Sequence, residues 1–258
     1  MVTVKNYLDR LQFSSAPSID ANGLSKLHER HLLTIPFENA DIYIQKPISL
    51  EIEAILDKVV NRRRGGFCYE LNGAFAWLLK ELGFTVHMLE ANVTNDAGEF
   101  GIPFDHAVLR VDFDKPYLVD VGFGRGFLNP LEWEYREEVR ERGGKWQLRD
   151  DKAGGLLLET FERKSMRFKP VYRVNPGRWD LKDFGEGCEY HQTSPDSPFT
   201  GGLICTIAAP DGRVTIRDSV LVIERNGRRE ETPLADDDAL AREVRRYFGF
   251  SLGDVENK

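Results

Sequence analysis

The first third of the chain carries apolar residues at helical spacing. One stripe covers residues 24–35, a second covers residues 52–60 behind a candidate cap at Ser49, and a third covers residues 67–82. Each stripe repeats every three or four residues, which predicts a helix with one buried face. Two glycines precede the third stripe and Gly83 follows it, so this helix has a clear beginning and end.

From residue 85 onward the period changes to the alternation that is typical of strands. Glycine, aspartate and proline separate the runs, which predicts an antiparallel sheet or barrel. A short helix over residues 181–190, two hairpin turns at Asp211-Gly212 and Asn226-Gly227, and a helix over residues 236–248 follow. The predicted strands are, in chain order, TVHMLEANV, HAVLRVDF, YLVDVGF, KWQLRD, LLLETF, MRFKPVYRV, LICTIAA, RVTIRD and SVLVIER.

The order of these elements predicts an α+β fold, with helices first, strands next and both together last. The chain has 258 residues, of which 41% are hydrophobic, so it can bury a sizeable core. The best boundaries lie near Gly83 and Val174 and divide the chain into residues 1–83, 84–174 and 175–258.

The charge balance argues against several classes of partner. A formal net charge of -7 at pH 7 offers no clustered basic field, so we expect neither nucleic acid nor a membrane as a partner. No run approaches the roughly 18 apolar residues of a membrane span. The first residues, MVTVKNYLDRLQF, lack the basic and apolar regions of a secretory signal, and we therefore expect a cytoplasmic protein.

Three cysteines limit the redox and metal chemistry. Cys68, Cys188 and Cys205 cannot all pair and none lies in a CxxC motif, so we expect neither a disulfide scaffold nor a metal site. Cys68 differs from the other two because it falls in the first turn of a predicted helix, where unpaired N–H groups and the helix dipole favour a thiolate. Cys188 and Cys205 are interpreted as core residues, which is the commoner role of a cysteine.

A histidine and an aspartate on neighbouring predicted strands could complete a thiol site. His106 opens one strand, Asp120 ends the next, and a hairpin turning at residues 114–116 would bring both to one edge of the sheet. A thiolate nucleophile needs a base that takes and returns its proton, and the base needs a carboxylate that fixes its tautomer. Taken singly, each residue also has an ordinary interpretation, as a satisfied histidine and a turn-forming aspartate.

Other polar residues have simpler interpretations. His28 and His31 lie three residues apart without a third ligand nearby, so an ordinary helix face is expected there. Arg64 could pair with Glu38, whose carboxylate would need a partner if it is buried. The glycines of residues 122–126 fit no phosphate-binding motif and are interpreted as letting the chain pass close to a ligand.

Five segments together resemble the arylamine N-acetyltransferase family. They are TIPFEN at residues 34–39, RRGGFCYELN around Cys68, FDHAVLRV at His106, DVGFG at Asp120 and TSPDSPFTGG at residues 193–202. The resemblance covers most of the chain in the same order. It implies a Cys68, His106 and Asp120 triad, acetyl-CoA as the donor and an acyl-cysteine intermediate.

The resemblance also implies a fold and a set of partners. The implied fold has an N-terminal helical domain with the nucleophile, a central antiparallel β-barrel with the histidine and aspartate, and a C-terminal α/β lid, around a catalytic core like that of transglutaminases and cysteine proteases. Expected partners are coenzyme A and an arylamine, arylhydrazine or hydrazide. By similarity, Phe37 and Phe123 line the substrate pocket, and Val93 and Arg125 are further candidates. Residues 101–103 depart from the family pattern.

Two other activities fit the same triad, and a binding module is a third alternative. A cysteine hydrolase or amidase would use water as the acceptor, although the short spacing from Cys68 to His106 differs from the roughly 130–150 residues of papain-type enzymes. An amide synthase within the family would use larger acyl thioesters. An inactive binding module is disfavoured because all three catalytic residue types are present.

Overall fold

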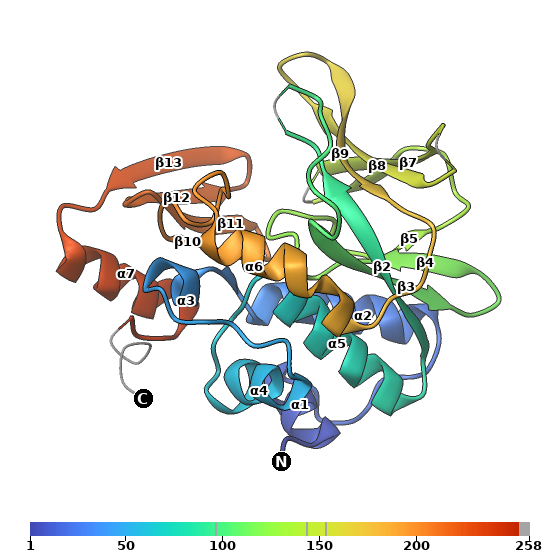
Figure 1. Ribbon diagram of the computed structural model, residues 1–258, viewed down its shortest axis with the longest axis horizontal. Coiled ribbons are helices and arrows are strands. Elements are labelled where there is room, and N and C mark those ends of the chain that lie inside the picture. The colour runs from blue at the N-terminus through green and yellow to red at the C-terminus, as the bar shows by residue number, and fades with distance from the viewer. Residues whose placement is uncertain (96, 143, 153, 253–258) are drawn as a thin grey trace.

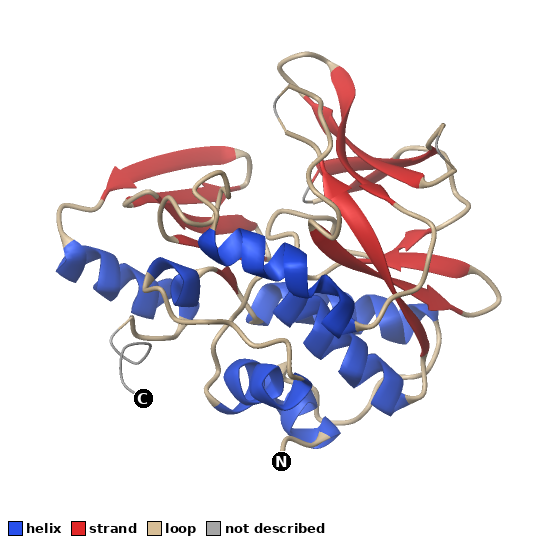
Figure 2. Ribbon diagram, in the orientation of Figure 1, coloured by secondary structure: helices blue, strands red, loops and turns tan. Residues whose placement is uncertain are grey.

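Two antiparallel sheets and a group of helices make up the protein (Figures 1 and 2). The computed structural model describes residues 1–95, 97–142, 144–152 and 154–252. One sheet, a nearly closed barrel, has eight strands in the order β5-β4-β3-β2-β9-β8-β7-β6, and the other has five in the order β1-β10-β11-β12-β13. The predicted α+β class is confirmed. No helix in these ranges is long and apolar enough to cross a membrane.

The predicted helices agree with the structure, with one correction, and two short helices over residues 4–10 and 40–43 were not predicted. The cap expected at Ser49 is wrong, because α4 begins after Glu51, whose N–H is bound by Ser49 Oγ at 3.1 Å. The helices are α1 (Val4–Arg10), α2 (Ala21–Thr34), α3 (Ala40–Tyr43), α4 (Ile52–Leu56), the π-helix η1 (Asp57–Asn61), α5 (Cys68–Leu82), the 3-10 helix η2 (Leu181–Phe184), α6 (Gly185–Thr193) and α7 (Asp237–Phe248).

The strands follow all nine predicted runs, and four further strands were not predicted. The unpredicted strands are β1, β5 and β6, which have two or three residues each, and β13, whose residues are all exposed. The strands are β1 (Phe37–Glu38), β2 (Thr85–Val93), β3 (His106–Asp112), β4 (Pro116–Val119), β5 (Leu131–Glu132), β6 (Val139–Glu141), β7 (Gly144–Asp150), β8 (Leu156–Glu162), β9 (Arg167–Val174), β10 (Ile204–Ala209), β11 (Gly212–Arg217), β12 (Val220–Arg225) and β13 (Arg228–Pro233).

Burial on both faces explains the continuous apolar sequence of β3. Ala107, Leu109 and Val111 belong to the apolar cluster that includes the helices. Val108 belongs to a second cluster inside the barrel, and His106 shares its side of the strand. The first cluster joins helices to β2 and β3 across the boundary near residue 83, so the division of the chain into three domains stays a prediction.

The five-stranded sheet lies beside the barrel, and α7 packs on one of its faces (Figure 1). Phe37 of β1 is opposite Thr206 of β10, which places it on the other face. On that face Arg213 of β11 donates to the carbonyl oxygen of Gly124, in the segment after β4. The two sheets are therefore joined through the segment that follows β4.

A buried network of five charged side chains fixes the chain ahead of α5. Arg64 Nη2 lies 2.6 Å from Glu38 Oε1, and Arg64 Nη1 lies 2.9 Å from Asp41 Oδ1, so the predicted Arg64–Glu38 pair is confirmed. Lys58 Nζ lies 2.6 Å from Asp41 Oδ2 and 2.8 Å from Glu70 Oε1. None of the five residues is more than 5% exposed. Each carboxylate depends on a buried cation, because an unpaired charge in an apolar interior is strongly unfavourable.

Arg64→Met is expected to lower the free energy of unfolding by about 3–5 kcal/mol, because Glu38 and Asp41 would remain buried without this cation. Arg62→Met is the matched control. Its guanidinium pairs with Asp57 at 3.0 Å but is 38% exposed, so a loss below about 1 kcal/mol is expected. Urea denaturation of both variants measures the difference, and equal losses would contradict a structural role for the buried network.

Candidate active site

The buried charge network holds Cys68 at the start of α5. Cys68 is the first residue of the helix and is 4% exposed. The N–H of Phe67, the preceding residue, donates to Glu70 Oε2 at 3.1 Å. The same carboxylate accepts from Lys58 Nζ at 2.8 Å. The position of the Cys68 thiol therefore depends on the buried Lys58–Glu70 ion pair, which holds the residue before it.

The carboxylate of Asp120 joins His106 to the segment that follows β4. His106 Nε2 lies 2.8 Å from Asp120 Oδ2, and the N–H of Gly122 donates to Oδ1 at 2.9 Å. The predicted hairpin produces this contact, since β3 and β4 pair from Leu109 opposite Val119 to the turn. Because Nε2 faces the carboxylate, Nδ1 is the ring nitrogen left for another partner.

Asn72 connects this pair to the helix of Cys68. It lies one turn after Cys68, and its Nδ2 donates to Asp120 Oδ1 at 2.9 Å and to the carbonyl of Ala107 at 2.7 Å. Its Oδ1 accepts from the N–H of Val121 at 3.0 Å. The sequence analysis missed Asn72. Its spacing of four residues from Cys68, which places both on one helix face, is the signal that could have found it.

Gly122 lets the segment after β4 approach α5. A Cβ atom at this position would lie 2.8 Å from Cys68 Cα and 2.6 Å from Asn72 Nδ2. The glycine is thus needed for the close approach to the backbone of Cys68, and the expectation that these glycines let the chain pass close to a ligand stays a prediction. The structure in this way brings Cys68, His106 and Asp120 to one place, although they come from α5, β3 and the end of β4.

The pKa values in this group move in opposite directions. Burial raises the pKa of the Cys68 thiol well above its usual value, and the nearby Cys188, Asp105 and Asp120 add to this effect. This burial opposes the thiolate that the helix terminus was expected to favour, and that expectation stays a prediction. Burial also tends to raise the pKa of Asp120, but the charge and hydrogen bond of His106 and the other donors outweigh it and lower that pKa. The charged form is thus disfavoured at Cys68 and favoured at Asp120.

Aromatic rings enclose the imidazole of His106. The ring of Phe123 lies 5.4 Å from it, and so does the ring of Tyr172 on β9. Phe37 contacts Phe199 at 6.0 Å between ring centroids. Its ring also lies 3.3 Å from the position that a Cβ of Gly124 would take. Of the two predicted pocket residues, Phe37 therefore lies against the 122–124 segment and Phe123 belongs to it, and their role in substrate binding stays a prediction.

The other two substrate candidates, Val93 and Arg125, make polar contacts with Asp105 and Glu224. Val93 ends β2 and donates its N–H to Oδ2 of Asp105, the residue before His106, at 2.8 Å. Arg125 has a side chain that is 59% exposed and pairs with Glu224 of β12. Val93 thus contacts the residue before His106, and Arg125 follows the 122–124 segment in the chain. Their proposed roles in substrate binding also stay predictions.

The two histidines of α2 are buried and do not lie on an exposed helix face, since His28 and His31 are both 0% exposed. His28 contacts the backbone of Asp120, a link that the sequence gave no sign of. Within the described residues, no group of three or more histidine, cysteine, aspartate or glutamate side chains could hold a metal ion.

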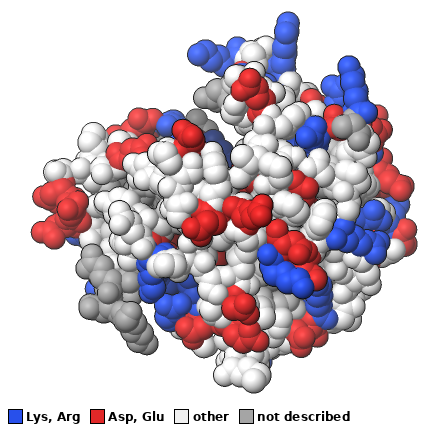
Figure 3. Space-filling model, viewed as in Figure 1, with Lys and Arg blue, Asp and Glu red and all other residues white. Residues whose placement is uncertain are grey.

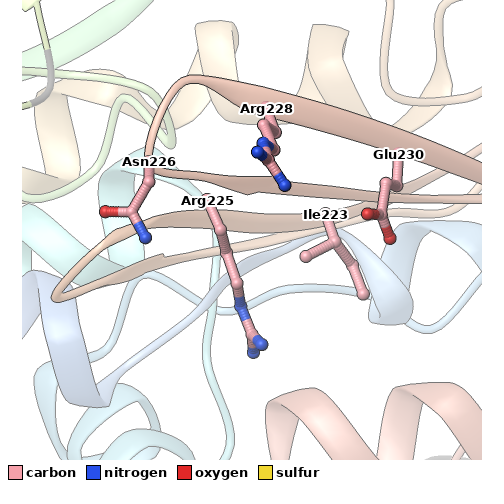
Figure 4. A pocket seen from close by; sticks show the side chains of 5 residues that line it. All are labelled: Ile223, Arg225, Asn226, Arg228 and Glu230. Carbon is pink, nitrogen blue, oxygen red and sulfur yellow. The ribbon is translucent and has the colours of Figure 1, made fainter.

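A pocket of about 550 Å³ lies elsewhere, on the hairpin of β12 and β13 (Figure 4). Its lining consists of Ile223, Arg225, Asn226, Arg228 and Glu230. Ile223 and Arg225 alternate with Glu224, so the pocket opens on the sheet face opposite the one that meets Arg125. It contains no nucleophile beside a base and adds no reacting group to the site.

The surface charge is unevenly distributed over the face shown in Figure 3. Acidic side chains mark the region of η2 and α6, where Asp183, Glu186 and Glu189 are exposed. Basic side chains gather at the tip of the β8–β9 hairpin, where Arg163 and Lys164 are exposed. A phosphate-bearing ligand would be repelled from the outer face of α6.

The chain is similar in sequence and in fold to known N-acetyltransferases. A family model described as N-acetyltransferase matches residues 20–256. An arylamine N-acetyltransferase of Mycolicibacterium smegmatis is 31% identical over 259 residues, which covers 98% of this chain and 93% of the relative. Human arylamine N-acetyltransferase 1 is 28% identical, with 96% and 94% covered. The structure of the Mycobacterium marinum arylamine N-acetyltransferase in complex with CoA has a TM-score of 0.90 at 32% identity, with 98% and 94% covered.

Gly122→Ala is expected to displace Cys68 and slow its reaction with iodoacetamide by about tenfold or more, since small misplacements of reacting groups have effects of this size. Gly126→Ala is the control, because its Cβ would meet no atom closer than 3.7 Å. Labelling rates at one pH, with circular dichroism to confirm folding, test this expectation. Similar rates in the two variants would show that the close approach at Gly122 is unimportant.

Cys68 should react with iodoacetamide below the usual thiol pKa of about 8.5, because its proton can move to His106. In His106→Gln the onset of labelling should move above that pH, since burial then acts on the thiol without a charged partner. Cys188 serves as an internal control, because burial raises its pKa to about 12. If the pH dependence of Cys68 labelling is unchanged in His106→Gln, His106 does not accept the proton of Cys68.

Proposed function

The chain belongs to the arylamine N-acetyltransferase family, and we propose that it transfers an acetyl group from acetyl-CoA to an aromatic amine or hydrazine through Cys68. The His106–Asp120 contact of 2.8 Å beside the start of α5 is the observation that carries this proposal. The donor is inferred from the M. marinum relative, whose structure holds CoA. In this proposal the helical part supplies the nucleophile, the barrel supplies the base and its carboxylate, and residues 175–258 act as the lid.

The first half-reaction moves the acetyl group to the protein. The Cys68 thiol gives its proton to His106, and Asp120 stabilises the imidazolium that results. The thiolate attacks the thioester carbonyl, a new C–S bond forms, and coenzyme A leaves with the proton from His106. Backbone N–H groups at the start of α5 are available to the oxyanion.

The second half-reaction selects the acceptor. An amine attacks the acetyl-cysteine in its neutral form, and His106 takes the proton that the nitrogen gives up while the Cys68 sulfur leaves. Aromatic amines and hydrazines are neutral near pH 7, whereas most alkylamines are protonated. The enclosure of His106 by Phe123 and Tyr172 adds an apolar surface that suits an aromatic acceptor.

Incubation of the protein with acetyl-CoA alone should produce one acetyl group on the Cys68 peptide, because the 4% exposure of this residue limits attack by water. Addition of aniline or an arylhydrazide should discharge it quickly, with ping-pong kinetics. A primary alkylamine of similar size should be slower at pH 7, and a higher pH should narrow the gap. Mass spectrometry of the peptide follows each step.

The same experiment separates the alternative activities. Release of coenzyme A at one rate with and without aromatic amine would make water the acceptor and the protein a hydrolase. Cys188→Ala and Cys205→Ala should keep most of the transfer while Cys68→Ala loses it. Equal losses in all three variants would contradict Cys68 as the nucleophile.

A further inference from the structure

One buried histidine contacts both ends of the segment that carries Asp120. His28 of α2 places Nδ1 2.9 Å from the carbonyl oxygen of Leu128. Its Nε2 lies 3.3 Å from the backbone nitrogen of Asp120 and 3.1 Å from the carbonyl oxygen of Asp120. The ring is therefore a bridge across residues 120–128, which are about 100 positions away in the sequence.

The chemistry of the neighbours defines the tautomer of His28. The partner of Nδ1 is a carbonyl oxygen, which only accepts hydrogen bonds, so Nδ1 carries a hydrogen. Burial lowers the pKa of His28 despite the hydrogen bonds and carboxylates that oppose this effect. In the neutral ring Nε2 then carries no hydrogen, so it accepts from the N–H of Asp120 at 3.3 Å and makes no hydrogen bond to the Asp120 carbonyl oxygen 3.1 Å away.

Packing holds the plane of this ring. His28 is stacked on Phe127 with centroids 5.5 Å apart and planes 3° apart, and its face meets the ring of Phe75 at 6.3 Å. Phe127 belongs to the bridged segment itself. A flat, fully buried ring with two hydrogen bonds has little freedom to move, so the two ends of the segment are held at a fixed separation.

The bridged segment makes the contacts that assemble the proposed triad. Asp120 binds His106, Gly122 lies against Cys68, and Phe123 lies against the His106 ring. We propose that His28 is a positioning residue for acetyl transfer, which clamps residues 120–128 at both ends and so sets the direction in which the Asp120 carboxylate meets His106. This inference rests on the proposed function, and His28 itself does not touch the reacting atoms.

His31 provides a matched control on the same helix. It is equally buried, and its Nε2 lies 3.0 Å from the hydroxyl of Tyr7, away from residues 120–128. His28→Phe and His31→Phe each keep an aromatic ring and lose buried hydrogen bonds. Formation of acetyl-Cys68 in a single turnover should be about 10- to 100-fold slower in His28→Phe than in His31→Phe. Rates are compared at a temperature where thermal melts show both variants folded.

Two conservative variants test the clamp if His28→Phe does not fold. In His28→Gln the side-chain oxygen can reach the position of Nε2 and accept from Asp120, whereas His28→Asn can reach only the position of Nδ1 and Leu128. His28→Gln should therefore form acetyl-Cys68 faster than His28→Asn. Equal rates in this pair, or in the two phenylalanine variants, would overturn the inference.

Nitrogen-15 NMR of the wild-type protein tests the clamp without any substitution. His28 should remain the neutral Nδ1–H tautomer from pH 6 to 8, and the other tautomer or a protonated ring would overturn the inference. A wild-type protein that forms no acetyl-Cys68 but shows this tautomer would contradict the proposed function and leave the clamp intact. If the wild type forms acetyl-Cys68 but the His28 and His31 variants do so at equal rates, the proposed function stands and the clamp is contradicted.

Discussion

The buried carboxylate of Asp120 is the constraint on which the rest of the site depends. A charge that is 1% exposed is stable only when its oxygen atoms are hydrogen-bonded, and the donors come from three elements: His106 of β3, Asn72 of α5 and the backbone of Gly122. The hydrogen bonds to this one carboxylate therefore hold the barrel against α5, the helix that carries Cys68. The backbone of Asp120 is fixed as well, by His28 of α2.

A second set of buried polar contacts explains why segments far from Cys68 matter to it. Glu38 pairs with Arg64 in the network that reaches the start of α5 through Lys58 and Glu70. Its neighbour Asn39 donates to the carbonyls of Phe199 and Gly202, both at 2.8 Å, and accepts from the N–H of Ile204. Within the TIPFEN segment, Asn39 thus holds the loop before β10, and Glu38 belongs to the network that holds the chain ahead of Cys68.

The sequence predicted what depends on local pattern and missed what depends on tertiary contact. Periodicity located nine strands and the helices other than the short α1 and α3, and the pairing of β3 with β4 placed His106 beside Asp120 as expected. Strand β13 could not be predicted, because its exposed polar residues carry no alternation and only the pairing with β12 makes it a strand. His28 was interpreted as an ordinary helix-face residue, because nothing in the local sequence shows that it contacts residues about 100 positions later in the chain. The burial that raises the pKa of the Cys68 thiol was not foreseen, because it is a property of the whole fold and not of the position of Cys68 at a helix start.

The burial of Cys68 constrains how its thiol can lose a proton. Burial raises the pKa of the Cys68 thiol and so opposes its ionisation alone, and in the proposed mechanism the thiolate forms together with a positive charge on His106. The imidazolium is in turn stabilised by Asp120, whose own pKa is lowered by the pairing. In the proposed mechanism the thiol and the imidazole therefore change charge together while the Asp120 carboxylate stays ionised, and the burial that couples them would also keep water from the proposed acyl-cysteine. Protection of that intermediate and the need for an accurately oriented imidazole would then follow from a single physical cause, which is why the proposal extends to residues that only position Asp120.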